Sequence, residues 1–321
     1  MNLSALIREV GRGPHGSRDL SEAAASELYG AMLDGRVAEM ELGAIQIALR
    51  VKGEGPEELR GFYRALEARL ARVELRDANA RPVVLPSYNG ARHQANLTPL
   101  LALLLGRLDV PVLIHGAPDA HGRITTEAVL EALGIAPSHD IAAVRARLDA
   151  GEIAYAPVDV LVPGLGALLA TRKRLGLRSS SHSLAKLIDP FGGRALRVVS
   201  VSHPDYIERM GRFLRETSAR ALLMRGTEGE PFANPKRRPR IELHLDGETE
   251  VLFEGETGSI ALPDLPSAID PRTTAEWTKS VLDRRVAVPS SLVDQLGCCL
   301  YGTGREASLA AARAVALGLV G

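Results

Sequence analysis

The chain has 321 residues, 45% of them hydrophobic, and its 39 Lys and Arg residues balance 39 Asp and Glu residues. These values are typical of an ordinary soluble globular protein with one large core, or one large and one small core. The longest apolar stretches, near residues 100–105, are too short to cross a bilayer. With no basic, apolar signal segment at the N-terminus, we expect a cytoplasmic protein without membrane contact.

Residues 1–77 are predicted to form a small helical bundle. The stretch "DLSEAAASELYGAMLDG" begins with the capping residues Asp19 and Ser21 and ends at Gly35. "ELGAIQIALRVKGEG" repeats the helical pattern, and "PEELRGFYRALEARL" places Pro56 in a first helical turn. Two further helical pieces within residues 163–187 are expected to complete this domain.

Residues 78–162 and 188–321 are predicted to form a large α/β domain. Short β-branched runs, "RPVVLP", "VPVLIHG", "ALRVVSVSH", "ARALLMRG" and "IELHLD", alternate with helical segments such as "TPLLALLLGRL" and "TTEAVLEALG". Alternation of this kind favours a mostly parallel central sheet flanked by helices. Cys298 and Cys299 are adjacent in a predicted helix and lack metal-ligand spacing, so we expect them in the core of a reduced protein.

The stretch "LPSYNGARHQANLTP", residues 85–99, is a candidate phosphate loop. It connects a predicted strand to a predicted helix, where N-terminal amides can bind an anion. Its interpretation as a working phosphate site, a converted site or a simple turn is open at this point. "YGTGREA", residues 301–307, also has glycines but no preceding strand, and a helix break is expected there.

Charge is unevenly distributed along the chain. Residues 161–199 carry seven cations and one acid, whereas residues 241–270 carry eight acids and no Lys or Arg. "NPKRRPR" places four cations just before the acidic block. We expect oppositely charged surfaces, with either a solvated basic face or a polyanion-binding groove as the role of the cations.

Along nearly its full length the sequence resembles the anthranilate phosphoribosyltransferases. The resemblance is carried by the helical N-terminal segment and by "RKRLGLRSSSHSLAKLIDP", which resembles the family's RxxLGxR element. It implies a homodimer joined through the helical domain, and a cleft for phosphoribosyl pyrophosphate, magnesium and an aromatic amine. The family's phosphate loop, GTGGD followed by NxST, corresponds here to "SYNGA" followed by "NLTP".

The family's catalytic motifs are only partly present. Asn96 and Thr98 match, but Ile114 stands where the KHGN motif has lysine. The metal motif's consecutive Asp and Glu are replaced by Pro231 and Phe232 in "RGTEGEPF". The resemblance therefore implies a scaffold without a complete site for magnesium.

Three further segments are "SYNGARHQANLTP", "GTEGE" followed by "ANP", and "VSHPDYI". They resemble a separate branch of the family, the YbiB-type proteins. That resemblance implies sequence-nonspecific binding of DNA or RNA without phosphoribosyl transfer, cofactor or metal. Aromatic residues make up 4% of the chain, so phosphate contacts rather than base stacking are expected to dominate. The predicted nucleic-acid contacts are Arg92, Arg172, Lys173, Arg174, Arg178, Lys186, Arg194, Lys236, Arg237, Arg238 and Arg240.

The alternative is a phosphoribosyl or glycosyl transferase that acts on another acceptor, with Mg²⁺ and phosphoribosyl pyrophosphate as cofactors. Glu228 or Glu230 would then recruit magnesium. A protein that uses a residual cleft to sense a small molecule or partner is a third hypothesis. The histidines His93, His115, His182 and His203 have no spaced catalytic partner and are interpreted as structural in the main hypothesis. Under the transferase alternative, phosphate or substrate contacts are Asn89, Gly90, Asn96, Thr98, His115 and Arg172.

Overall fold

The computed structural model describes residues 2–13, 15–117, 122–257 and 263–320. Internal contacts divide the chain into a helical unit, Met1–Ala71 with Val158–Ile188, and an α/β unit, Arg72–Pro157 with Asp189–Gly321. The sequence-derived boundaries after residues 77, 162 and 187 lie near these divisions. Each unit is described by itself below.

The helical unit is built from helices whose ends follow from local sequence. Ser21 caps α2 by accepting from the amide of Ala24, α3 ends at Gly53, and α4 begins with Pro56. The buried carboxylate of Glu58 accepts from the amides of Leu20 (3.0 Å) and Gly55 (2.8 Å) and pairs with Lys52 Nζ at 2.6 Å. The helices of this unit are α1 Leu3–Val10, α2 Glu22–Leu33, α3 Glu39–Lys52, α4 Pro56–Glu67, α8 Val158–Leu161, α9 Leu165–Ala170, α10 Arg172–Leu175, α11 Ser180–Leu184 and the 3₁₀ helix Ala185–Leu187.

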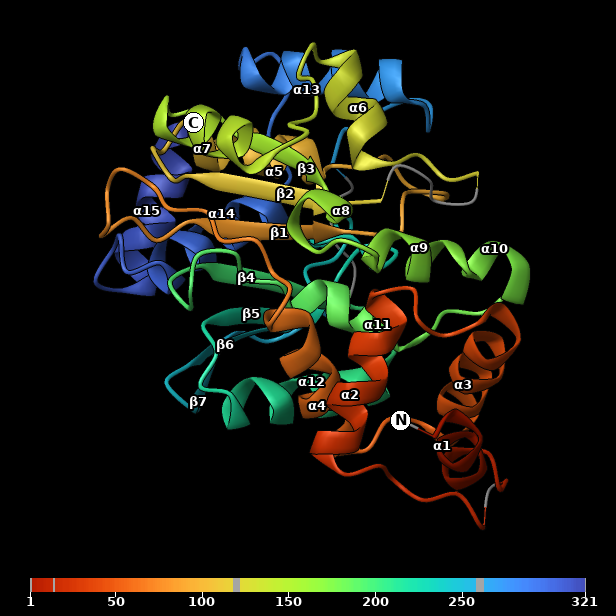
Figure 1. The fold of residues 1–321 in the computed structure, drawn as a ribbon. Coiled ribbons are helices and arrows are strands. Elements are labelled where there is room, and N and C mark those ends of the chain that lie inside the picture. Colours follow the sequence, from red (N-terminus) through yellow and green to blue (C-terminus); the bar gives the residue numbers. More distant parts are fainter. Residues whose placement is uncertain (1, 14, 118–121, 258–262, 321) are drawn as a thin grey trace. The chain divides into compact units, whose positions relative to one another are not determined.

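The α/β unit contains a seven-stranded sheet in the order β3-β2-β1-β4-β5-β6-β7 (Figure 1). Neighbouring strands from β3 to β5 are parallel, and β6 and β7 continue the sheet in antiparallel fashion. The strands are β1 Val83–Ser87, β2 Val112–Gly116, β3 Ala154–Pro157, β4 Leu196–Val201, β5 Ala221–Arg225, β6 Ile241–Leu245 and β7 Glu248–Phe253.

Helices cover the parallel strands and close the core. Every residue of β1, β2 and β4 is buried, as expected for parallel strands with helices on both faces. Helix α5 packs on β1 and β2, α14 on β5, and α12 on β4, β5 and β6. The helices of this unit are α5 Thr98–Gly106, α6 Thr126–Ala132, α7 Ile141–Asp149, α12 Pro204–Glu216, α13 Pro271–Leu282, α14 Ser290–Gly302 and α15 Leu309–Val320.

The predicted α/β class, with a helical unit and a mostly parallel sheet, is confirmed. The buried positions of Cys298 and Cys299 in α14 are confirmed as well, and residues 303–308 separate α14 from α15. In the described part of the chain, no helix is both long and apolar enough to span a bilayer. Strands β3 and β7 were not predicted. β3 has only four residues, and β7 begins with two glutamates that alternate with other residues and interrupt the apolar pattern.

Candidate functional site

Three loops of the α/β unit meet at the carboxyl edge of the parallel strands. Residues 88–97 follow β1, residues 226–240 follow β5, and the end of the segment after β2 carries Arg123 and Ile124. The carboxyl ends of parallel strands lie at one edge of a sheet, where α/β proteins commonly bind ligands. A backbone bridge between Ala91 and Ile124 fastens two of these loops together.

Glu230 fills the first half of the predicted phosphate loop. Its carboxylate is fully buried and accepts from the amides of Asn89 at 2.7 Å and Gly90 at 2.9 Å. The hydroxyl of Ser87 also donates to it, and Thr126 Oγ1 lies 3.3 Å away. The amides that could have cradled a phosphate here therefore hold an anion of the chain itself.

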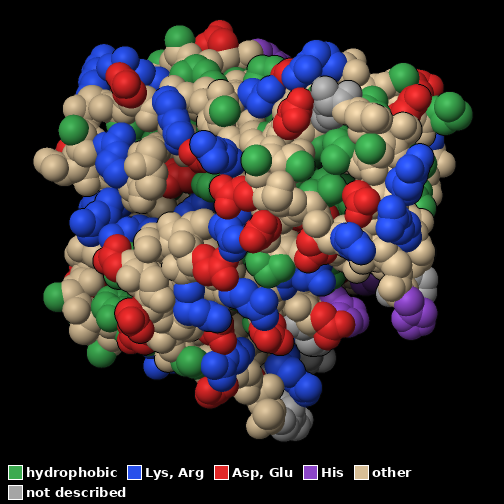
Figure 2. All heavy atoms as spheres, turned by 60° about the horizontal axis from the view of Figure 1, so that its bottom comes forward, with side chains coloured by type: hydrophobic (Ala, Val, Ile, Leu, Met, Phe, Trp, Pro, Cys, Tyr) green, Lys and Arg blue, Asp and Glu red, His purple; other side chains and the backbone are tan. Residues whose placement is uncertain are grey.

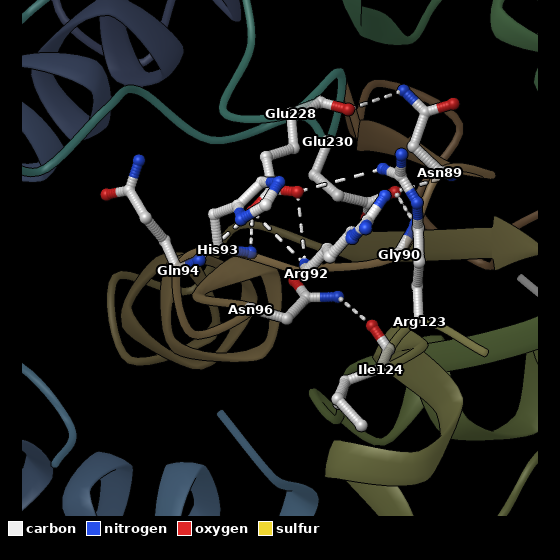
Figure 3. A network of polar contacts seen from close by, with 10 residues as sticks. All are labelled: Asn89, Gly90, Arg92, His93, Gln94, Asn96, Arg123, Ile124, Glu228 and Glu230. Atoms are coloured by element: carbon white, nitrogen blue, oxygen red, sulfur yellow. Dashed lines mark hydrogen bonds and ion pairs between the residues drawn. The ribbon is translucent and has the colours of Figure 1, made fainter. Parts of the chain in front are cut away.

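Glu228 fills the second half of the loop (Figure 3). Its Oε1 accepts from the amides of His93 at 2.8 Å and Gln94 at 3.0 Å, and its Oε2 accepts from the amide of Arg92 at 3.0 Å. Arg123 Nη1 lies 3.7 Å from the same carboxylate. The remaining amide of the loop, that of Ala91, donates to the carbonyl of Ile124. Every amide from residue 89 to residue 94 is thus engaged within the chain.

These contacts do not fit a magnesium site. Both carboxylates face hydrogen-bond donors, and Glu228 also faces the guanidinium of Arg123, whereas Mg²⁺ requires several oxygen ligands in octahedral arrangement. Among the described residues, no group of three or more His, Cys, Asp or Glu side chains could hold a metal ion. The arrangement of Glu228 and Glu230 therefore gives no support to the magnesium role in the transferase alternative.

Asn96 and Thr98, the residues retained from the family loop, lie in the core beneath it. Asn96 Nδ2 donates to Thr126 Oγ1 at 2.9 Å, and Asn96 Oδ1 accepts from the amide of Thr98. Both residues are fully buried. In this conformation they brace the loop from below rather than present groups to a ligand.

His115 is also internal. It is fully buried, its Nδ1 is hydrogen-bonded to Tyr88 Oη, and its Nε2 has no partner among the described atoms. Burial lowers the pKa of His115 to about 3. The imidazole is therefore neutral at neutral pH and offers a phosphate no positive charge.

Stability is expected to fall below pH 6.5 because each unit buries a neutral histidine. In the helical unit, burial and the nearby charge of Arg178 lower the pKa of His182 to about 3. An unfolded histidine binds a proton near pH 6.5, so stability is full above that value. As pH falls from 6.5 toward 3, each buried histidine lowers the free energy of unfolding by about 1.4 kcal/mol per pH unit. Urea unfolding at pH 7.5, 6.5 and 5.5 measures this slope, and a His115→Gln variant with an unchanged slope would contradict the assignment.

The Lys and Arg side chains of the helical unit that are predicted to contact nucleic acid differ in solvent exposure. Lys173 and Arg174 are exposed on α10, and Arg174 pairs with Glu39 at 2.9 Å, whereas Arg172 and Arg178 are half-buried. Lys186 is only 7% exposed, which does not favour the predicted contact with nucleic acid. In the α/β unit, Arg194 is half-buried and donates to the carbonyls of Phe191 and Ala78.

The basic run at residues 236–240 divides into two parts. Lys236 and Arg237 are exposed. Arg238 instead pairs with the buried Asp294 and lies over the ring of Phe253, with its Cζ 4.4 Å from the centroid. Arg238 is therefore a structural residue of the α/β unit.

Arg240 and the acidic block also neutralise each other. Arg240 pairs with Glu242 and Glu254, each at 2.8 Å. The expectation that the acids lie apart from these cations is wrong, because the β6–β7 hairpin brings them together. On the face drawn in Figure 2, Lys and Arg side chains are largely interspersed with Asp and Glu.

Comparison with known proteins places this chain in a family. Residues 4–69 match the model of a glycosyl transferase family, helical bundle domain. An anthranilate phosphoribosyltransferase of Methylocella silvestris is 30% identical over 212 residues, which cover 65% of this chain and 60% of that protein. The uncharacterized protein YbiB of Escherichia coli (strain K12) is 46% identical over 312 residues, 96% of this chain and 97% of that protein. The chain belongs to the YbiB branch of the anthranilate phosphoribosyltransferase family.

A solved structure of this family has the same fold. Anthranilate phosphoribosyltransferase from Saccharomyces cerevisiae, in complex with PRPP and Mg, superposes with a TM-score of 0.73 at 13% identity, covering 99% of this chain and 93% of that one. At this identity the likeness concerns the fold alone. The fold of the anthranilate phosphoribosyltransferase family is therefore retained in this chain, whatever its loops bind.

Sequence reasoning missed what Glu228 and Glu230 do in this anthranilate phosphoribosyltransferase fold. It considered them as magnesium ligands, whereas they accept hydrogen bonds from the phosphate loop. It also passed over Arg123, which approaches Glu228. The available signal was the pair of acids in "GTEGE" together with the loss of the acid from the phosphate loop, in a segment far away in the sequence.

Proposed function

We propose that this protein binds DNA or RNA without sequence preference, on a phosphoribosyltransferase scaffold that does not transfer phosphoribosyl groups. The proposal depends chiefly on the occupation of the amides of Asn89 and Gly90 by the fully buried carboxylate of Glu230. A diphosphate would have to displace this carboxylate at the place where the fold otherwise offers it donors. Repulsion between like charges in a buried site opposes such binding.

The residues around the loop support the same conclusion. Ile114 stands on β2 where the family pattern has lysine, and it is fully buried. His115 beside it is held neutral. Positions 114 and 115 therefore supply no cation that would stabilise a leaving diphosphate.

Exposed cations offer contacts for a nucleic-acid backbone. In the α/β unit, Arg92 lies in the loop after β1, and Lys236 and Arg237 lie in the loop after β5. In the helical unit, Lys173 and Arg174 are exposed on α10. Cations of this kind bind phosphates of any sequence by releasing counterions.

Two titrations of the same preparation test the proposal. Gel shifts with random-sequence duplexes and single strands, run at several salt concentrations, should show binding that weakens steeply with salt. Calorimetry with phosphoribosyl pyrophosphate and Mg²⁺ should show no heat at millimolar ligand. Binding to neither nucleic acid, or salt-independent binding, would overturn the proposal, and a clear heat of binding would favour the transferase alternative.

The transferase alternative has one specific observation in its favour. The yeast protein with the same fold is in complex with PRPP and Mg, and Asn96, Thr98 and His115 remain in this chain. For phosphoribosyl transfer, Glu228 and Glu230 would have to leave the loop. A transfer assay with aromatic amines tests whether they do.

We further propose a cytoplasmic homodimer that associates through the helical unit. Helix α3 exposes Met40 (80%) and Val51 (72%), and a cavity of about 480 Å³ lies between α1 and α3. Exposed apolar side chains beside an apolar groove suit a contact between two copies. Sedimentation equilibrium measures the assembly, and a monomer at all concentrations would contradict it.

A further inference from the structure

The amides of Arg92, His93 and Gln94 form a compact anion site. Three successive amide groups converge on the Glu228 carboxylate at 2.8–3.1 Å, and Arg123 approaches it from another loop (Figure 3). Successive amides that point to one place form a concavity suited to a phosphate or carboxylate group. Here the place is taken by a side chain of the same unit.

Glu228 is held less firmly than Glu230. The Glu228 side chain is 13% exposed, whereas Glu230 is fully buried and also contacts hydroxyl groups beneath the loop. Arg92, whose amide belongs to the site, is itself exposed. An external anion can therefore approach the position of Glu228 but not that of Glu230.

The backbone at Glu228 is also in an unfavourable conformation. Its φ of +54° lies in the left-handed region, which a glutamate rarely adopts. The next residue, Gly229, has φ +88°, and a Cβ there would overlap the side chain of Asn89. Asn89 Nδ2 donates to the carbonyl of Glu228 at 3.0 Å and holds the turn in place. Such strain commonly marks a functional segment with an alternative arrangement.

We propose that Glu228 is a displaceable internal anion and that a phosphate oxyanion takes its place. The incoming phosphate accepts from the amides of residues 92–94 and pairs with Arg123, while the Glu228 side chain turns to solvent. One anion replaces another, so the site keeps its charge balance. The proposal deepens the proposed function, on which its nucleic-acid ligand rests, by assigning one backbone phosphate to a defined position.

Two substitutions remove the internal negative charge without removing the donors of the site. Glu228→Gln keeps the size of the side chain but not its charge, and Glu228→Gly removes the side chain and suits the positive φ, so it preserves the fold. Glu248→Gln, at an exposed position on β7, is the matched control for the change in net charge. Arg123→Gln combined with Glu228→Gln removes the pairing cation.

Thermal unfolding in sodium phosphate and in sodium chloride of equal ionic strength tests the site itself. Phosphate should raise Tm of both Glu228 variants by at least about 2 °C more than that of the wild type or of Glu248→Gln. The rise in Tm caused by phosphate should be smaller when Arg123 is also replaced. Equal responses to phosphate in all variants would overturn the proposal.

A labelled oligonucleotide of random sequence decides whether the phosphate comes from nucleic acid. Removing the Glu228 carboxylate should tighten binding about tenfold, because the phosphate no longer has to displace it. The salt slope should stay nearly unchanged, because the same number of phosphates is held. A response to inorganic phosphate with unchanged oligonucleotide binding assigns the site to free phosphate. If neither the wild type nor any variant binds oligonucleotide, the proposed function fails while the phosphate experiment still decides the site.

Discussion

Replacing Glu230 with alanine is expected to lower the free energy of unfolding of the α/β unit by about 2–5 kcal/mol. The substitution leaves the amides of Asn89 and Gly90 without their acceptor in a site closed to solvent. Each buried donor that loses its partner costs about 1–3 kcal/mol. Guanidinium unfolding followed by circular dichroism measures the change.

A control separates this effect from the loss of a negative charge. Glu248→Ala removes a carboxylate from the exposed end of β7 and should change stability by no more than about 0.5 kcal/mol. If Glu230→Ala were as mild as this control, Glu230 would not be the element that fixes the loop. The argument against a diphosphate site would then lose its main support.

Reversing the charges of Lys236 and Arg237 is expected to weaken nucleic-acid binding by roughly tenfold or more and to reduce the salt slope by about two. Both residues are exposed in the loop after β5. Phosphate contacts carry no sequence information, so duplexes and single strands of any sequence should be affected alike. Gel shifts at several salt concentrations measure both quantities.

The matched control is Arg272→Glu with Lys279→Glu on α13, which changes net charge equally at two other exposed positions. An equal loss of binding in both double variants would show that total charge, rather than this loop, determines affinity. Arg238→Glu is unsuitable for the test. It would place a carboxylate against the buried Asp294 and unfold the unit before binding could be measured.

The elements of this fold follow closely from local patterns. Ser21, Pro56 and the glycines after α3 set helix ends, and the β-branched runs became five of the strands. Each signal depends on residues near one another in the chain. β7 was not predicted because the search for strands relied on the periodicity of apolar residues. The glutamates of β7 are tolerated because this edge strand is exposed, and they break that periodicity.

The site could not be predicted to the same degree. The contacts of Glu230 with Asn89 and Gly90 join positions about 140 residues apart, and nothing near either segment indicates that they meet. The pairing of Arg238 with Asp294 is equally remote in sequence. A count of charges therefore predicted a basic surface where part of the charge is neutralised within the fold.

The last strand of the sheet has a consequence for behaviour at high concentration. β7 exposes Glu248, Thr249, Glu250 and Val251 along the outer edge beyond β6. An open edge invites a strand from another molecule, and repeated addition of this kind leads to aggregation. Glutamates facing glutamates across such a junction would repel each other. The acidic hairpin thus gives the protein a built-in resistance to forming continuous intermolecular sheets.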